Sequence, residues 1–354
     1  MGVDPVDRGF CEQRAQPVLG ITMNRPLRVG LVGAGMVSQY HVAGWRECPD
    51  AQLVAIADPD LSKAKARAVL VPGAHVFETL GEMISVCDLD AIDIVTPPAT
   101  HAELIAEAQA AGLHVICQKP LAPNAAEAAA IVENQSLHLR AMVHENWRWR
   151  HPYRALKSAL EAGEINRPKQ FEFRVESSGL LPDHTGQLPA LVRQPFFADM
   201  PQLLVFELLV HHLDTLTFLF GDLEIAKARL SYRCDAVRGE DRAVVDLVAG
   251  GISGRLIGDF CVTDAPQMPR DRLFLDSGDQ PVVDGWSITL PDTGAHAWDP
   301  VSAYEVSYAE TIRHFRDNVK TGERFDTEFK DALVLQTIVG HIYQLSEHNW
   351  AIPL

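Results

Sequence analysis

The feature that most constrains the fold is a glycine turn between an apolar strand and a helix. Residues 27–33 read LRVGLVG, a short apolar run ending in glycine, which is typical of a buried parallel strand. Gly33 and Gly35 match the start of a dinucleotide-binding turn, and residues 36–46 have a helical composition. At such a turn the free N–H groups of the helix bind a pyrophosphate. Ser38 stands at the third glycine position, which needs only a small side chain.

Strands and helices alternate from residue 27 to about residue 148. This pattern predicts right-handed βαβ units and a doubly wound parallel sheet, a Rossmann domain. Thr100 and Glu103 have the spacing of a capping box, which predicts a helix that begins at Thr100. The predicted strands cover residues 27–33, 53–57, 91–95, 113–117 and 140–143, and the predicted helices cover residues 36–46, 63–70, 100–112 and 124–134.

After residue 148 the pattern changes to that of an α+β domain with an open, mostly antiparallel sheet. Residues 170–176, QFEFRVE, alternate apolar and charged side chains, which indicates a strand with one buried and one solvent-exposed face. Residues 1–26 are expected to be a loose extension, residues 27–148 the NAD-binding domain, and residues 149–354 a second domain, to which the family resemblance described below assigns substrate binding and oligomerisation. Further strands are predicted at 228–237, 242–249, 252–262, 271–276 and 286–290, and helices at 152–161, 202–220, 302–320 and 330–346.

The charge balance argues against several classes of partner. The chain of 354 residues has a formal net charge of −16, which repels the phosphates of nucleic acids and of anionic membranes. No apolar run reaches the length of a membrane-spanning helix. The six cysteines form no CxxC pair, so we expect reduced thiols and a cytoplasmic protein.

Polar residues follow several of the predicted strands, at the edge where open α/β sheets bind ligands. Asp58 ends the second predicted strand and can bind the ribose hydroxyls of NAD, which favours NAD over NADP. A turn-forming Asp before Pro59 is the alternative reading. Lys119 follows the strand at 113–117 and can hold a substrate hydroxyl, although on spacing alone a solvated lysine is the more common case.

The apolar helix predicted at residues 202–220 contains four titratable side chains. Glu207, His211 and Asp214 lie at i, i+4 and i+7, so a regular helix would present them on one face. Buried polar groups must be paired or used, and histidine is a natural general acid or base. His212 is expected to be structural or to contact the substrate. No metal is expected, because the adjacent histidines diverge and no HExxH or paired-cysteine motif is present.

The chain resembles the glucose–fructose oxidoreductase / inositol dehydrogenase (Gfo/Idh/MocA) family of NAD(P)-dependent oxidoreductases from residue 27 to the end. Two departures stand out: Gln118 replaces the Glu of the family's Glu-Lys-Pro motif, and Glu207 replaces its usual Asp. The resemblance is carried by the turn at Gly33–Ser38 with His41 after it, the segment Thr96–His101, the pair Lys119-Pro120, the run Asn146-x-Arg148 through Pro152 and Lys157 to Gly163, and the closing segment Tyr304–Leu354.

The resemblance implies roles for particular residues. The implied catalytic residues are Lys119, His211 and Glu207. Cofactor binding is implied for Gly33, Gly35, Met36, Val37, Asp58, Thr96, Pro97, Pro98, His101, Gln118 and Lys119. Substrate binding is predicted for Lys119, Trp147, Arg148, His184, Glu207, His211 and His212, where His184 is suggested by its place in the long loop at residues 177–200.

The implied function is NAD-dependent hydride transfer between a sugar, polyol or inositol-like alcohol and nicotinamide, in a homo-oligomer. One alternative is a catalytically weak sensor of sugar or dinucleotide with the same fold, which the two departures keep open. Another is a dehydrogenase of a dihydrodiol or of a nucleotide-linked sugar. A nucleotide sugar would need an extra anion site, for which Arg148, Arg150 and Arg193 are the candidates.

Overall fold

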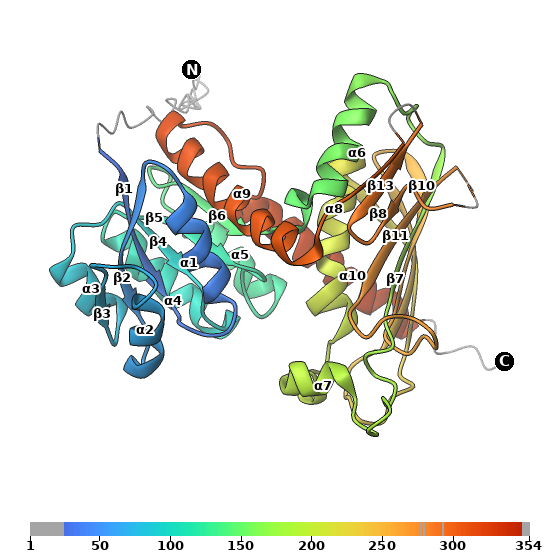
Figure 1. The fold of residues 1–354 in the computed structure, drawn as a ribbon, viewed down its shortest axis with the longest axis horizontal. Helices are drawn as coiled ribbons and strands as arrows, with labels where there is room; N and C mark the ends of the chain where they lie inside the picture. Colours follow the sequence, from blue (N-terminus) through green and yellow to red (C-terminus); the bar gives the residue numbers. More distant parts are fainter. Residues whose placement is uncertain (1–24, 277, 279, 292–293, 349–354) are drawn as a thin grey trace, which may run out of the picture.

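The computed structural model describes residues 25–276, 278, 280–291 and 294–348, which form two units, each built around its own sheet (Figure 1). The first sheet has the order β3-β2-β1-β4-β5-β6, and all of its strand pairs are parallel. This is the strand order of a dinucleotide-binding Rossmann domain. Its strands are β1 (Leu27–Val32), β2 (Ala51–Ala57), β3 (His75–Phe77), β4 (Ala91–Ile94), β5 (His114–Gln118) and β6 (Ala141–His144).

The helices of the first unit connect these strands. The short β3 and α3 were not predicted, since three residues of strand and two helical turns give little periodicity. The capping box at Thr100 was wrong: its hydroxyl donates to Pro97 O and Thr96 Oγ1, and the Pro98–Thr100 turn precedes the helix. The helices are α1 (Ser38–Glu47), α2 (Leu61–Ala68), α3 (Leu80–Val86), α4 (His101–Ala110) and α5 (Ala125–Glu133), with the 3₁₀ turn η1 (Pro98–Thr100).

The second unit has an eight-stranded sheet in the order β14-β13-β12-β11-β7-β10-β9-β8. Among the described strands of this second sheet, only β7 and β10 pair in parallel, so the predicted mostly antiparallel sheet is confirmed. The first strand after the long helix begins at residue 223, five residues before its predicted start. The strands are β7 (Gln170–Glu176), β8 (Leu223–Ser231), β9 (Arg242–Ala249), β10 (Ile252–Asp259), β11 (Arg270–Leu275), β12 (Val283–Asp284), β13 (Ser287–Leu290) and β14 (Gly294–Ala297).

One face of this sheet is covered by helices, and its core lies between β7, β9, β10 and the helices α6 and α8 (Figure 1). The predicted helix at 202–220 begins instead as a π-helical turn, η4, which then continues into α8. The elements are the 3₁₀ turn η2 (Trp147–Trp149), α6 (His151–Ala162), α7 (Pro189–Arg193), the 3₁₀ turn η3 (Pro195–Asp199), the π-helical turn η4 (Leu204–Leu209) and α8 (Val210–Phe220).

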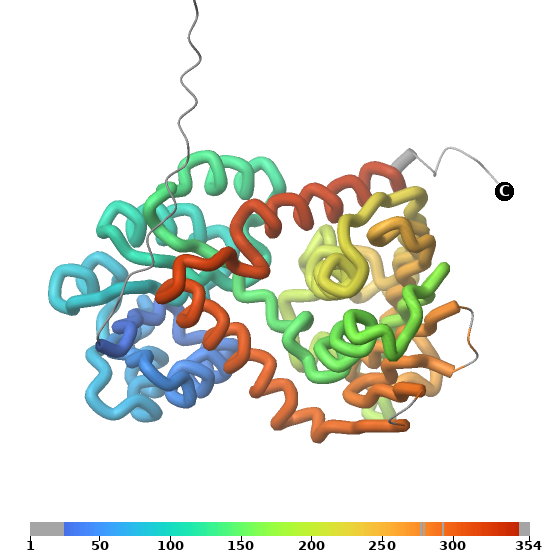
Figure 2. The backbone as a smooth tube through the Cα atoms, turned by 90° about the horizontal axis from the view of Figure 1, so that it is seen from above, coloured from blue at the N-terminus to red at the C-terminus, as the bar shows by residue number. Residues whose placement is uncertain are grey.

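The last two helices, α9 (Pro300–Thr321) and α10 (Phe329–His348), return to the first unit. Figure 2 shows them in red, running from one unit to the other. Ile312 and Phe315 of α9 are buried against Leu27 and Trp45, and Phe329 is buried with the opposite face of the parallel sheet. The domain boundary predicted near residue 148 stays a prediction, but residues from the second half clearly complete the core of the first.

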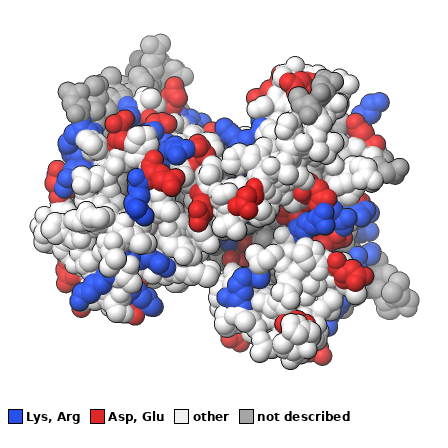
Figure 3. Space-filling model, in the orientation of Figure 1, with Lys and Arg blue, Asp and Glu red and all other residues white. Residues whose placement is uncertain are grey.

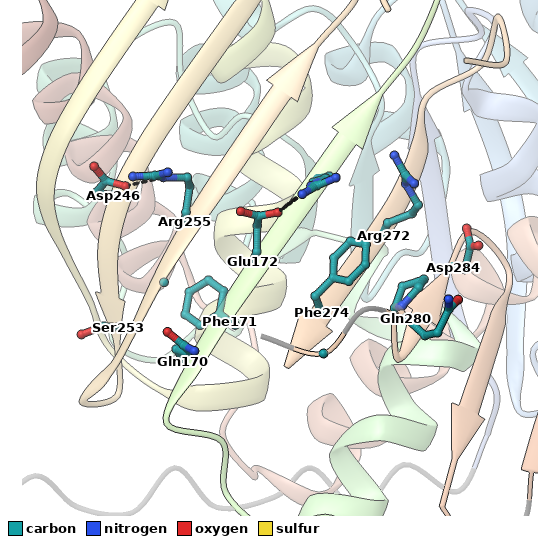
Figure 4. A pocket seen from close by; sticks show the side chains of 14 residues that line it. Gln170, Phe171, Glu172, Asp246, Ser253, Arg255, Arg272, Phe274, Gln280 and Asp284 are labelled. Carbon is teal, nitrogen blue, oxygen red and sulfur yellow. Dashed lines mark hydrogen bonds and ion pairs between the residues drawn. The ribbon is translucent and has the colours of Figure 1, made fainter. Parts of the chain in front are cut away.

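The outer face of the eight-stranded sheet has a broad hollow of about 770 Å³, lined by residues of β7, β9, β10 and β11 (Figure 4). Ion pairs on it join Arg174 to Glu172 and Arg255 to Asp246. Elsewhere, acidic and basic side chains are interspersed on the face seen in Figure 3. Among the helices of the described residues, none combines the length and the apolar character that crossing a bilayer requires.

Candidate active site

The glycine turn after β1 has the geometry that a dinucleotide needs. Gly33 has a φ of +102°, and a Cβ there would fall onto the carbonyl oxygen of Val95. Gly35 has no heavy atom within 4 Å of its would-be Cβ, and Met36 is 57% exposed, so the turn is open on its outer side. The N-cap residue of α1 is Val37, and no side chain caps the N–H groups of this helix end. Open N–H groups at a helix N-terminus fit a pyrophosphate.

Asp58 lies next to this turn. Its Oδ2 accepts from the Ala34 N–H at 2.7 Å and its Oδ1 from the Asp60 N–H at 2.8 Å. A carboxylate oxygen can accept more than one hydrogen bond, so ribose hydroxyls can still bind. Arg67 was not predicted: its Nε donates to Ser38 Oγ at 2.8 Å and its Nη2 to Gly35 O at 3.0 Å, which ties α2 to the turn.

The segments after β4 and β5 meet at the same edge of the sheet. His101 joins them, since its Nε2 lies 2.9 Å from Thr96 O and its Nδ1 lies 3.1 Å from Pro120 O. The ring is fully buried, and both nitrogens are occupied by backbone carbonyls. The direct cofactor contact predicted for His101 is therefore corrected to a structural role. Thr96 is half-buried and Pro97 is exposed on this edge.

Lys119 connects this edge to the second unit. Its Nζ lies 3.1 Å from Glu207 Oε1 and donates to the Glu207 carbonyl oxygen at 3.0 Å. Glu207 belongs to the π-helical turn η4, whose wider hydrogen-bond spacing leaves carbonyls free for other donors. The predicted regular spacing of Glu207, His211 and Asp214 is therefore interrupted, and each of these side chains has a different partner.

A buried carboxylate fixes the start of the π-helical turn. Glu240 is fully buried and accepts from the N–H groups of Leu203 and Val205, at 3.2 and 2.9 Å. It also accepts from the Tyr343 hydroxyl at 2.5 Å. Burial raises the pKa of Glu240, while these donors oppose the rise. No motif in the sequence marked this residue.

His211 forms a buried pair with Glu145, which sequence reasoning missed. His211 Nδ1 lies 2.7 and 2.8 Å from the two Glu145 oxygens, and Trp147 N–H also donates to the carboxylate. Burial lowers the pKa of His211, and Glu145 opposes this shift only partly. The pKa of Glu145 is also lowered, because His211, together with the Trp147 N–H and Lys119, outweighs the effect of burial. The pair is thus a neutral imidazole with an ionised carboxylate, which leaves Nε2 as the free nitrogen of the ring.

Trp147 lies between two side chains. Its ring stacks on His211 at 4.0 Å with an angle of 10°, and the Arg150 guanidinium lies 3.4 Å from its centroid. Two groups this close cannot share one face, so both faces of the indole are covered. The substrate contact predicted for Trp147 is thereby restricted to the edge of the ring, and its face orients His211.

The other residues predicted to bind substrate either pair with other protein side chains or lie on the surface. Arg148 and Asp214 form a buried bidentate pair, at 2.5 and 2.8 Å, and His212 Nε2 lies 2.9 Å from Asp271. The substrate contact predicted for Arg148 is therefore corrected to a structural role. Both ring nitrogens of the buried His212 are engaged, which fits the structural alternative stated for it. His184 lies exposed in the loop before α7, and no hydrogen bond among the described residues joins it to Lys119.

These elements define an NAD-binding Rossmann protein with an attached α+β unit, whose polar cluster of Lys119, Glu207, His211 and Glu145 lies where the two units meet. Residues 27–143 match the sequence profile of the oxidoreductase family with an NAD-binding Rossmann fold. Over these residues, about a third of the chain, the match agrees with the family that the sequence resembles. Among the described residues, no group of three or more His, Cys, Asp or Glu side chains has the arrangement of a metal site.

Two named relatives are sugar and polyol dehydrogenases. The chain is 33% identical to the D-apiose dehydrogenase of Paraburkholderia graminis, over 61% of this chain and 55% of the relative. It is 32% identical to inositol 2-dehydrogenase 4 of Saccharopolyspora erythraea, over 56% of this chain and 55% of the relative. The chain thus spans little more than half the length of these curated relatives.

Solved structures show the same overall fold. An oxidoreductase from Agrobacterium radiobacter, in complex with NAD⁺, L-tartaric acid and magnesium, superposes with a TM-score of 0.80 at 23% identity, covering 91% of this chain and 97% of that one. A myo-inositol dehydrogenase from Corynebacterium glutamicum superposes with a TM-score of 0.74 at 20% identity, covering 92% and 97%. At these identities the likeness shows the fold.

Proposed function

We propose that the protein is an NAD-dependent oxidoreductase that transfers hydride between a sugar, polyol or inositol-like alcohol and nicotinamide. The observation that carries this proposal is the cluster of Lys119, Glu207 and the His211–Glu145 pair, at the edge of a Rossmann sheet with an open glycine turn. The named relatives act on compounds of this class, which supports the proposal.

The cofactor supplies the hydride acceptor when it is bound, and the protein supplies position and proton transfer. The Gly33–Val37 turn and Asp58 would hold its pyrophosphate and ribose. His211 Nε2 takes the hydroxyl proton of the substrate alcohol, since Nδ1 is engaged by Glu145. Lys119 binds and polarises the same oxygen, and Glu207 binds a neighbouring substrate hydroxyl or orients Lys119.

The engaged arginines weigh against a nucleotide-linked sugar. Arg148 is paired with Asp214 and Arg150 with Asp271, so two of the three cations suggested for an extra phosphate site are already neutralised. Glu207, which stands where the resemblance implies an Asp, contacts Lys119 directly, and this favours an active enzyme over a sensor. NAD is preferred to NADP in this proposal because Asp58 would repel a 2′-phosphate.

A turnover screen tests the proposal. Wild type and Lys119→Ala are assayed for NADH and NADPH absorbance with inositols, aldoses, sugar acids and glycosides. The proposal expects turnover by wild type with NAD, and a loss of at least about 10²-fold in the variant, the smallest effect usual for a proton-transfer group. NADH binding, followed by fluorescence, should change little. Tight NADH binding without turnover of any substrate would support the sensor instead.

Self-association and location are further parts of the proposal. The outer face of the eight-stranded sheet carries charged pairs and no covering helix, so a second copy can bind there (Figure 4). Light scattering tests this: wild type should be at least dimeric, and Arg255→Glu together with Arg174→Glu should yield monomers. Dimers that persist in this variant would show that the outer face of the sheet is not the dimer interface. The five described cysteines carry free thiols, as is usual in a reducing cytoplasm.

A further inference from the structure

A buried polar chain runs from the middle of the parallel sheet to the backbone of Lys119. It begins at Asp93 in β4, which is fully buried. Asp93 Oδ2 accepts from Trp45 Nε1 at 2.7 Å and lies 2.8 Å from His41 Nδ1. His41 is also fully buried, and its Nε2 lies 2.8 Å from the side-chain amide nitrogen of Gln118. The amide oxygen of Gln118 accepts from the Lys119 N–H at 3.0 Å.

The donors and acceptors in this chain have only one consistent arrangement. The Lys119 N–H can only donate, so the Gln118 amide must turn its oxygen toward Lys119 and its nitrogen toward His41. The amide nitrogen also only donates, so His41 Nε2 must accept and carries no proton. The single ring proton of His41 is then on Nδ1, where it is donated to Asp93.

A carboxylate at position 118 is incompatible with this arrangement. It offers acceptors only, so a hydrogen bond with His41 Nε2 would require a second proton on the ring. The ring would become an imidazolium between two carboxylates, with its centroid 4.3 Å from that of the buried His144 ring. Glu is the residue that the family's motif places here, and Gln118 is this chain's departure from it.

We propose that Gln118 and His41 are positioning residues that hold the Lys119 backbone through a neutral relay from Asp93, and that the amide of Gln118 selects the Nδ1–H tautomer of His41. The catalytic consequence rests on the proposed function, because Lys119 is the group that is positioned. The tautomer itself is a property of the protein without cofactor or substrate, so it can be tested separately.

Nitrogen-15 NMR of the histidine rings, on the full chain without cofactor, tests the relay directly. In wild type at neutral pH, His41 should show a protonated Nδ1 and an unprotonated Nε2. In Gln118→Glu, both nitrogens should become protonated. Gln52→Glu is the matched control, since it adds the same charge at an exposed position in β2 and should leave the His41 signals unchanged. A protonated Nε2 in wild type, or an unchanged ring in Gln118→Glu, would overturn the proposal.

Kinetics then test the positioning role. Misplacing a catalytic group by about 1 Å costs on the order of 10²-fold in rate, and the displacement expected here is smaller, so kcat of Gln118→Glu should fall by about tenfold. KM for the alcohol and NADH affinity should change by less than about threefold, and Gln52→Glu should keep wild-type kcat. An unchanged kcat in Gln118→Glu would contradict the positioning role of Gln118. Absence of turnover in wild type would instead contradict the proposed function, and the NMR test of the His41 tautomer would remain valid.

Discussion

The glycine turn after β1 and the polar cluster around Lys119 are the two halves of the candidate site, and they are built in different ways. The turn consists of one continuous segment, and its geometry comes from the backbone: a positive φ at Gly33 and open space at Gly35. The Lys119 cluster joins side chains from the segments after β5 and β6, from η4 and from α8, and the contact between Lys119 and Glu207 spans 88 residues of sequence. Local backbone geometry leaves a sequence motif, whereas pairing between distant segments does not.

The largest effect should come from the distant pair that the sequence did not mark. Glu145→Gln keeps the shape of the side chain but allows the wrong His211 tautomer, because an amide can donate to Nδ1. We expect kcat to fall by about 10³-fold or more, as is typical when a histidine base loses its orienting carboxylate. Steady-state kinetics with the substrate found in the screen measure this. The control is Glu133→Gln, an exposed acid on α5, and equal kcat values in the two variants would contradict the role of Glu145.

The next effect concerns stability within the second unit. Asp214→Asn leaves the Arg148 guanidinium buried without its charge partner, which costs about 3–5 kcal/mol when a buried pair is broken. Urea unfolding measures the loss of free energy of unfolding. Asp246→Asn removes the partner of the half-exposed Arg255 and should cost less than about 1 kcal/mol. Similar losses in both variants would mean that the Arg148–Asp214 pair contributes no more than a surface pair.

A smaller effect distinguishes the role of Gly33 in folding from the role of Gly35 in cofactor binding. Gly33→Ala forces a positive φ and a clash with Val95, so it should destabilise the fold by about 1–3 kcal/mol. Gly35→Ala meets open space, so the melting temperature should stay close to that of wild type. NADH binding should nevertheless weaken by at least about tenfold, because the methyl group occupies the space that the pyrophosphate needs. Wild-type NADH affinity in Gly35→Ala would contradict this placement of the cofactor.

The smallest effect is a dependence of stability on pH. Burial lowers the pKa of His101, His144 and His211 below the ordinary value of 6.5. The unfolded chain therefore binds more protons than the folded one below pH 6.5, and the free energy of unfolding falls as the pH drops through that value. Asp214 acts in the opposite direction, since burial raises its pKa to about 6.

Melting temperatures between pH 7.5 and pH 5.5 measure the net effect. Burial also lowers the pKa of His114 and His314 and raises the pKa of Glu240 and Asp331. The five histidines outnumber the three carboxyl groups, so the melting temperature should be lower at the acidic end. The fall should be shallower in His144→Gln, which has one buried histidine fewer. A melting temperature that rises toward pH 5.5 would show that the buried histidines are not neutral in the folded protein.

The sequence predicted the first unit better than the second for a physical reason. Buried parallel strands are continuous apolar runs, and two of the helices between them begin at a capping side chain, Asp60 or Asn124. The Rossmann sheet and the positions of Asp58 and Lys119 were therefore predictable. The missed β3 has only three residues. In the second unit, the π-helical turn could not be predicted, because Leu203, Val205 and Tyr343 support it through Glu240, a contact between distant segments.

Transfer of deuterium tests the central claim most directly. A substrate from the screen, deuterated at its carbinol carbon, is oxidised by wild type and by Lys119→Ala, and the reduced nicotinamide is analysed by mass spectrometry. The account predicts one deuterium in the NADH formed by wild type and a rate at least about 10²-fold lower in the variant. NADH without deuterium, or equal rates in the two proteins, would contradict direct hydride transfer at a site that contains Lys119.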